Sequence, residues 1–111
     1  MKSNKSLFLE FFGDYPLIRI LDFLLENNLF DYSKKDICRN ANVSWNTLET
    51  FWGSLEKKGV VVFTRKVGKA SLFKLNAKNP VVAKLIELDN WLMKKSIEKI
   101  SPEKEKIRAV A

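Results

Sequence analysis

Apolar residues recur at intervals of three and four over much of this chain, which is the spacing of the buried face of an α-helix. In PLIRILDFLLENN, which begins at Pro16, leucines at this spacing lie opposite arginine, aspartate and glutamate. Proline is favoured in the first helical turn, so the pattern predicts an amphipathic helix that ends near Asn27 and Asn28. The stretch LFLEFF, residues 7–12, is too short for its period to distinguish helix from strand.

Two further helices are predicted on either side of a tight turn. Ser33 can cap a short helix with the sequence KKDICRN, and Ser44 can cap a helix that runs to about Lys58. Asn42 lies between them where the chain must reverse, and asparagine tolerates a left-handed backbone better than most residues. The helix after Ser44 carries one apolar stripe, and Gly59 marks its end.

After this third full helix the pattern changes from helical to extended. The β-branched run VVVFTR and the later stretch ASLFKL are separated by KVGK, in which Gly68 indicates a turn. A β-hairpin with a basic tip is therefore predicted. Asn79 followed by Pro80 is typical of a helix start, and this last helix is expected to run to about Ile100.

This order of elements is that of a winged helix-turn-helix, so the expected fold class is mainly α with a small β-hairpin wing and a long C-terminal helix. The chain from Gly13 to about Leu92 also resembles a family of small archaeal winged helix-turn-helix transcriptional regulators. The resemblance rests on LDFLLENNLFDYSK, ANVSWNTL and LEKKGVVVFTRKVGKASLFKLNAKNPVVAKLIELD. It implies binding of double-stranded DNA, with the helix of residues 44–58 in the major groove and the wing of residues 65–69 beside the phosphates.

A chain of 111 residues has room for one compact core with a segment added at each end. We expect an apolar leader over residues 1–12, the DNA-binding domain over 13–78, a C-terminal helix over 79–101 and a mobile charged tail over 102–111. No apolar run is long enough to span a bilayer, and no signal peptide is evident, so a cytoplasmic location is expected.

The net charge of +7 is unevenly distributed along the chain. Residues 1–43 contain six basic and six acidic residues, whereas the segment from Lys57 to Ile86 contains eight basic residues and no acidic one. A field of one sign over this length suits a polyanion such as DNA. The chain has no histidine and a single cysteine, Cys38, so we expect no enzyme activity, no cofactor and no metal site.

The helix expected to read DNA is the least cationic part of this basic half. A helical projection places Asn46 and Thr50 opposite the buried stripe, with Thr47 beside them. Glu49 lies toward the edge of this face and Trp45 at its boundary, and both depart from the small polar or basic residues common in such helices. Neutral side chains still suit base recognition, because asparagine pairs with adenine and a carboxylate accepts from cytosine. Base readout is therefore assigned to these five residues.

Contact with the DNA backbone is assigned to a separate set of groups, because phosphate contacts position a protein while base contacts discriminate sequence. The set comprises residues of the second full helix, the third helix and the wing: Lys34, Lys35, Arg39, Ser44, Lys57, Arg65, Lys66 and Lys69. A solvated basic surface, or protection of the hairpin edge from pairing, is the alternative role for these charges.

The last predicted helix carries two neighbouring apolar stripes. One, with Val81, Leu85, Leu88 and Leu92, can cover the winged core, and the second needs a partner outside it. One interpretation is a twofold homodimer built from the leader and this helix, which would place two recognition helices about 34 Å apart. Its interface would contain Leu7, Phe8, Phe11, Phe12, Val82, Ile86, Met93 and Ile97. The other interpretation is that leader and helix cover each other within a monomer. A protein-binding module with little specific DNA binding is the alternative function, and a small-molecule effector stays open.

Overall fold

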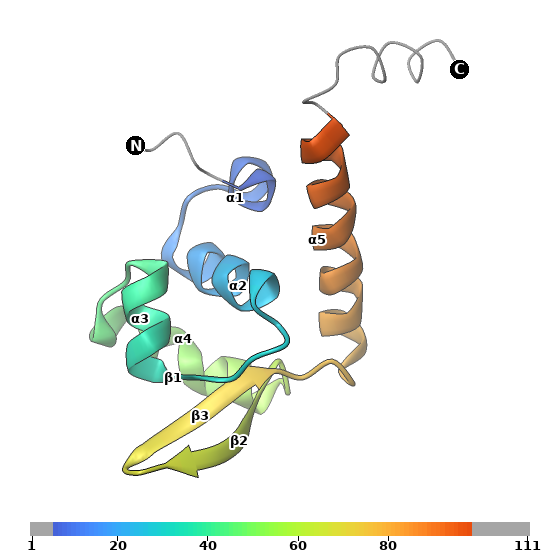
Figure 1. Cartoon of the computed structure of the whole chain (residues 1–111). Helices are drawn as coiled ribbons and strands as arrows, with labels where there is room; N and C mark the ends of the chain where they lie inside the picture. The colour runs from blue at the N-terminus through green and yellow to red at the C-terminus, as the bar shows by residue number, and fades with distance from the viewer. Residues whose placement is uncertain (1–5, 99–111) are drawn as a thin grey trace, which may run out of the picture.

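The computed structural model of the protein describes residues 6–98. Within them, five helices and three strands follow in the order α1 (Leu7–Phe12), α2 (Pro16–Glu26), β1 (Tyr32–Ser33), α3 (Lys34–Ala41), α4 (Trp45–Lys57), β2 (Val61–Val67), β3 (Ala70–Leu75) and α5 (Pro80–Glu98). The strands form one antiparallel sheet in the order β1-β3-β2. The β2–β3 hairpin projects below α3 and α4, while α5 stands on the other side of the molecule (Figure 1). The winged helix-turn-helix predicted from the sequence is confirmed.

Helices α3 and α4 form the helix-turn-helix, and a serine caps each of them. Ser33 Oγ accepts the backbone N–H of Asp36, and Ser44 Oγ accepts that of Thr47, both at 3.1 Å. Each serine thus satisfies one of the N–H groups that have no partner within the helix. Between the helices, Asn42 has φ 58° and ψ 51°, a left-handed conformation. Both caps and the turn were predicted from the sequence, and all three are confirmed.

Arg19 of α2 fixes the turn between α3 and α4 from outside. Its Nε donates to the carbonyl of Ala41 at 2.9 Å, and its Nη2 donates to the carbonyl of Asn42 at 3.1 Å. Carbonyls at the end of a helix lack partners in their own helix, so a guanidinium that bonds two of them stabilises the turn. The sequence pattern placed Arg19 on the face of α2 opposite its apolar stripe, and the structure shows that this position meets the helix-turn-helix.

The core lies where α2, α3 and α4 meet the sheet. The apolar stripe predicted for α4 is confirmed, because Leu48 and Trp52 are both buried. In α2 the predicted stripe is correct at Leu24, which is buried, but Leu17 and Leu21 are only partly buried against the core. Helices α2, α3 and α4 each contact the sheet, so the wing is anchored to all three of them. No helix in residues 6–98 has the length and apolar character required to cross a membrane.

In the part of the leader that the structure describes, residues 7–12 form a helix, α1, which packs against α2 and α5 of the same chain (Figure 1). Phe8 and Val82 are buried in the core of this single chain. Their assignment to a contact with a second copy was therefore wrong. The reason is that the buried face of α5 includes Val82, while Val81, which the sequence pattern placed in the core stripe, is exposed.

The other residues of the predicted interface are divided between the core and the surface. Leu7 and Ile86 pack partly against the core. Phe11, Phe12 and Met93 are exposed. The side chain of Ile97 and the tail of residues 102–111 lie outside the part of the chain that the structure describes.

Three carboxyl groups lie close together where α2 faces α5. Asp22 and Glu26 belong to α2, and Asp89 of α5 is only 4% exposed. Burial raises the pKa of all three groups, and the negative charge of Asp22 raises the pKa of Glu26 and Asp89 further. A hydrogen bond of 2.8 Å from the Ser6 hydroxyl opposes this effect at Asp22. The ionised form of Asp89 is therefore unfavourable in the folded protein.

Asp89→Asn is expected to stabilise the protein near pH 8 by about 1 kcal/mol, because it removes a buried charge without changing the shape of the side chain. Since the pKa of Asp89 is raised above its ordinary value in the folded state, folding binds protons, and stability falls as pH rises through the raised value. The variant should show a weaker decline, measured by urea unfolding at about pH 4 and pH 8. Glu87→Gln on the exposed side of α5 is the matched control, and a destabilised Asp89→Asn at pH 8 would contradict this account.

Candidate nucleic-acid interface

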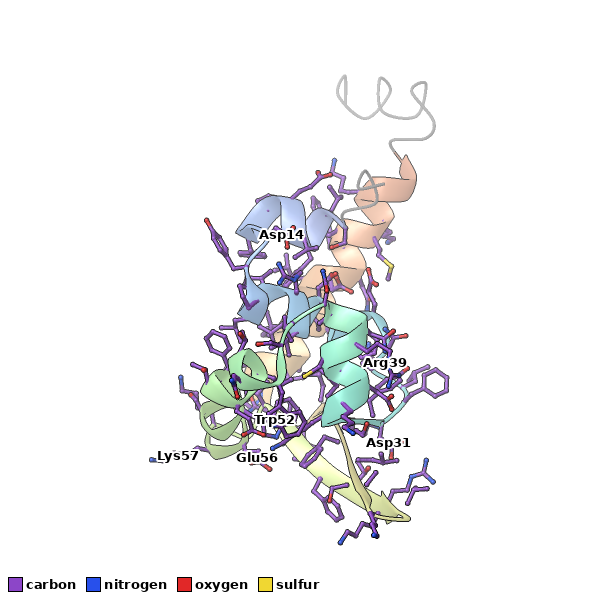
Figure 2. The ribbon with its side chains drawn as sticks, turned by 90° about the vertical axis from the view of Figure 1, so that its left-hand side faces the viewer. Asp14, Asp31, Arg39, Trp52, Glu56 and Lys57 are labelled. Carbon is purple, nitrogen blue, oxygen red and sulfur yellow. The ribbon has the colours of Figure 1, made fainter. Side chains whose placement is uncertain are left out.

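The exposed face of α4 is a row of mostly neutral side chains, as the helical projection predicted. Asn46 and Thr50 are exposed, and the Thr50 hydroxyl donates to the carbonyl of Asn46 at 3.0 Å. That bond leaves the methyl group of Thr50 as its apolar contact surface. A Cβ added at Gly53 would meet nothing within 4 Å, so this face is open to a partner. Lys57 projects outward from the far end of the helix, away from buried Trp52 (Figure 2).

The hydroxyl groups at the start of α4 are engaged in its cap. Ser44 Oγ donates to Thr47 Oγ1 at 2.9 Å, in addition to accepting the backbone N–H of Thr47. Thr47 is only half-buried, but its hydroxyl is part of this cap. The cap leaves the Asn46 amide and the Thr50 methyl group as the freer contact groups of the face.

Glu49, the acidic residue that the sequence placed at the edge of this face, is paired with Lys34 of α3. Lys34 Nζ lies 3.1 Å from Glu49 Oε2. The same ammonium lies 5.7 Å from the ring centroid of Trp45 and 5.6 Å from that of Trp52. These are cation–π distances, so Lys34 is held by a carboxylate and two indoles. Its assignment as a free phosphate contact does not fit this geometry.

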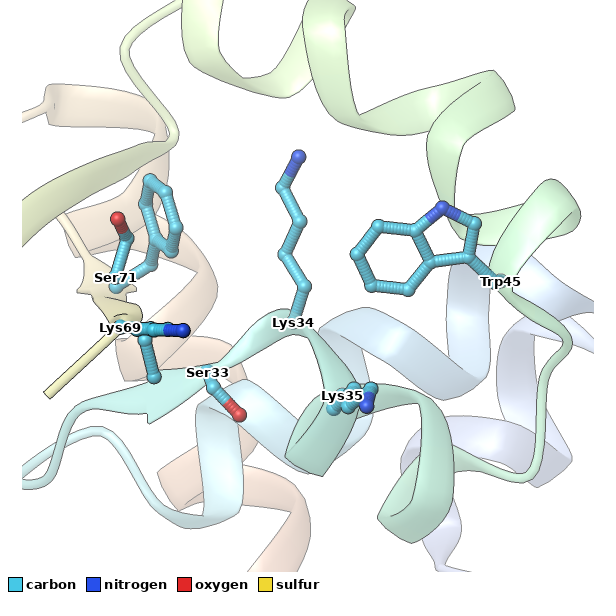
Figure 3. A pocket seen from close by; sticks show the side chains of 8 residues that line it. Ser33, Lys34, Lys35, Trp45, Lys69 and Ser71 are labelled. Atoms are coloured by element: carbon cyan, nitrogen blue, oxygen red, sulfur yellow. The ribbon is translucent and has the colours of Figure 1, made fainter.

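A hollow of about 480 Å³ lies between the start of α3, the start of α4 and the wing (Figure 3). Trp45 and Phe73 contribute aromatic side chains to it, and Lys35 and Lys69 approach it from α3 and from the wing. The full lining is Ser33, Lys34, Lys35, Trp45, Lys69, Ala70, Ser71 and Phe73. The hollow therefore combines cationic and aromatic groups from three elements that the sequence pattern assigned to DNA contact.

The wing directs its basic residues to two different faces of the sheet. Lys66 pairs with Ser71, whereas Arg65 pairs with Leu72, and side chains of neighbouring positions on a strand point to opposite faces. Ser71 lines the hollow, so Lys66 shares its face of the sheet. Arg65 lies on the other face. The predicted wing set is therefore divided: Lys66 and Lys69 lie on the side of the hollow, and Arg65 does not.

Arg65 is bound instead to Asp31, which precedes β1. Its Nε lies 3.0 Å from Asp31 Oδ2, its Nη2 lies 3.2 Å from Oδ1, and the Thr64 hydroxyl donates to Oδ2 at 2.6 Å. These bonds, first that from Arg65 and then that from Thr64, lower the pKa of Asp31 to about 2. Arg65 thus joins the wing to Asp31 on the face opposite the hollow, a geometry that does not support its predicted contact with DNA.

The remaining predicted cations are accessible. Lys35, Lys57, Lys66 and Lys69 are exposed, and no ion pair joins any of them to another residue within 6–98. Arg39 is also exposed but pairs with Asp36 of its own helix at 3.0 Å. The surface around the hollow and along α4 therefore has uncompensated positive charge at its edges and a nearly neutral centre.

A metal site and a reactive thiol each have requirements that can be compared with the described residues. Between residues 6 and 98, cysteine, aspartate and glutamate form no group of three or more that could hold a metal ion. Burial raises the pKa of the half-buried Cys38 thiol, an effect that the nearby Glu49 increases. A thiol that resists ionisation is a packing group rather than a nucleophile.

The sequence matches no protein-family model and no curated protein. Among solved structures, NadR in complex with 4-hydroxyphenylacetate is similar over 82% of this chain and 65% of its own, with a TM-score of 0.57 and 23% identity. The chain shares its fold with NadR. Sso10a-2, a DNA-binding protein from Sulfolobus solfataricus, aligns over 83% of this chain and 92% of its own, with a TM-score of 0.49 and 16% identity.

The chain spans about two thirds of the length of NadR, so the likeness concerns the fold. Sequence reasoning missed two residues that shape the interface, Arg19 and Asp31, and it assigned Lys34 to the phosphates rather than to Glu49. Asp31 and Arg65 are separated by 34 positions, so no local pattern joined them.

Proposed function

We propose that the protein is a regulator that binds double-stranded DNA, with the exposed face of α4 in the major groove and the inner face of the wing along the phosphates. One observation carries the proposal: Lys35 and Lys69 border the same hollow, and Lys66 shares the face of the sheet that lines it. That face is the one that meets α4, because Phe73 on it contacts Trp52 edge-on at 5.2 Å. A single duplex would therefore meet the neutral helix face and the cations together.

The proposed base-reading groups are those of the exposed α4 face. The Asn46 amide can donate to and accept from an adenine edge, and the Thr50 methyl can contact a thymine methyl. Gly53 allows close approach of the helix backbone to the duplex, because no side chain stands there. Trp45, which lines the hollow, and Glu49 lie beside these groups on α4, and Thr47 supports them through the cap.

The proposed backbone-contact set is smaller than the sequence predicted. It keeps Lys35, Lys57, Lys66 and Lys69, with Arg39 at its periphery. Ser44 belongs to it through the start of α4, where free N–H groups and the helix dipole favour a phosphate.

The test of this proposal is selection of bound duplexes from a random pool, followed by the variant Asn46→Ala. Asn46→Ala should weaken binding to the selected site by about 1–3 kcal/mol and leave binding to random DNA nearly unchanged, because it removes a base contact. Lys66→Ala is the control, and it should weaken binding to both duplexes alike. If the two variants have the same effect on both duplexes, the division between base-recognising and phosphate-contacting residues is wrong.

The proposal includes a homodimer whose interface is smaller than the one predicted from the sequence. Phe11, Phe12 and Met93 are exposed on α1 and α5, which supports burial of these side chains in a contact between two copies. Footprinting of the selected site would then show two half-sites about 10 base pairs apart, and a single half-site would argue for a monomer.

The exposed indole of Trp45 favours the second candidate function, in which α4 binds a protein instead of DNA.

A further inference from the structure

Lys34 and Lys35 are adjacent at the start of α3 but leave the helix in different directions. Lys34 extends into the space beside Trp45, whereas Lys35, which also borders the hollow, leaves α3 in another direction (Figure 3). The Lys34 side chain is only 25% exposed, compared with 41% for Glu49, whereas Lys35 is exposed. Two lysines that the sequence treats as equivalent therefore have different surroundings.

The contacts of Lys34 compete with any phosphate for its ammonium group. Moving Lys34 Nζ to a phosphate would break its 3.1 Å pair with Glu49 and its approach to both indole rings. It would also leave the Glu49 carboxylate unpaired beside a polyanion, where like charges repel. When DNA is bound, the Lys34–Glu49 ion pair is therefore more favourable than a contact between Lys34 and a phosphate.

With the Lys34–Glu49 pair intact, one oxygen of the Glu49 carboxylate can still accept a hydrogen bond from a base. Lys34 occupies Oε2 of Glu49, and no hydrogen bond within residues 6–98 is made by Oε1. A carboxylate can accept from the N4 amine of cytosine in the major groove. Glu49 follows Asn46 by three positions on α4, so the two side chains lie on neighbouring parts of one helix face.

We propose that Lys34 is a positioning residue for sequence readout: it neutralises Glu49 and holds its carboxylate so that Oε1 accepts from a cytosine beside the base read by Asn46. This inference rests on the proposed function, DNA binding through α4, and adds to it a base preference and a residue that sets it. Lys34 acts through Glu49 and does not contact the phosphates.

The test compares Lys34→Met with Lys35→Met, which makes the same chemical change at the adjacent position. Each variant is used for selection from a random duplex pool, and its affinity for the wild-type site is measured over a range of salt concentrations. Lys34→Met should reduce the preference for cytosine at one position about tenfold while leaving the slope of log affinity against log salt unchanged. Lys35→Met should keep the preference and reduce the slope by about 0.9, the value for one phosphate contact. Lys34→Arg should restore the cytosine preference.

Glu49→Gln provides an independent test should Lys34→Met fold poorly by circular dichroism. The amide keeps the shape of the carboxylate but no longer needs Lys34, and it should shift the preference at the same position from cytosine toward adenine. A Lys34→Met variant that behaves like Lys35→Met, or a cytosine preference unaffected by Glu49→Gln, would overturn the inference while DNA binding itself stands. Wild-type protein that selects no duplex at all would overturn the proposed function instead.

Discussion

Trp52→Ala is expected to destabilise the protein by about 3–5 kcal/mol, the cost of emptying a large aromatic site in a core. Trp52 is 1% exposed and contacts Phe73 of β3 edge-on, with 5.2 Å between ring centroids. It therefore joins α4 to the wing, and its loss removes packing from both elements. Small domains are stable by about 5–15 kcal/mol in total, so the variant should be substantially unfolded at moderate urea concentrations. Urea unfolding followed by circular dichroism measures the change.

Two further tryptophan variants test this explanation. Trp91→Ala makes the same substitution at a side chain of α5 that is 55% exposed, and it should change stability by less than about 0.5 kcal/mol. Trp52→Phe should cost far less than Trp52→Ala, because Trp52 Nε1 is buried without a hydrogen-bond partner in the described structure, and phenylalanine removes that unsatisfied donor. Equal losses for Trp52→Phe and Trp52→Ala would contradict this explanation, because they would show that a phenyl ring restores none of the packing that the indole provides.

The parts of the fold that the sequence predicted depend on interactions within four residues. Ser33 and Ser44 each cap a helix by accepting an N–H three positions later, and Asn42 provides a left-handed turn by itself. Such contacts follow from residue type and spacing alone. The order of elements in a winged helix-turn-helix can therefore be predicted from a single sequence.

The face of the sheet on which each wing side chain lies was not predictable, because it depends on a register shift in the hairpin. Phe63 pairs with Phe73 and Arg65 pairs with Leu72, so Thr64 is an extra residue in β2. Simple alternation would place Arg65 on the same face as Phe63 and Lys66 on the opposite face. The extra residue reverses this order, so that Lys66 lies on the face that meets α4 and Arg65 reaches Asp31.

The same limit explains the errors in α5 and α3. An apolar pattern identifies an amphipathic helix, but it does not decide whether Val81 or Val82 faces the core when both are valine. Nor does it show that Lys34 meets Glu49, which follows it by 15 positions and belongs to another helix. These contacts are set by how elements pack, and packing is not encoded in local spacing.

Removing three cations from the proposed DNA surface is expected to reduce affinity for duplex DNA several hundred-fold at about 0.1 M salt. The variant is Lys35→Gln, Lys66→Gln and Lys69→Gln combined, and each lysine lies on the side of the sheet that contains the hollow. Each phosphate contact releases counterions and contributes about 0.9 to the slope of log affinity against log salt. The combined variant should therefore reduce the slope by about 2.7. Fluorescence anisotropy with a labelled duplex at several salt concentrations measures both quantities.

The control changes net charge by the same amount on another part of the molecule. Lys78→Gln, Lys84→Gln and Lys94→Gln combined affect the loop before α5 and α5 itself, where the proposal places no DNA. Its slope should match that of the wild type, because distant charges are screened at this salt concentration and release no counterions from a bound duplex. Arg65→Gln should also leave the slope unchanged, since its guanidinium is bound to Asp31 on the other face of the wing. Equal slopes for the two triple variants would mean that net charge, and not the surface beside α4, attracts the nucleic acid.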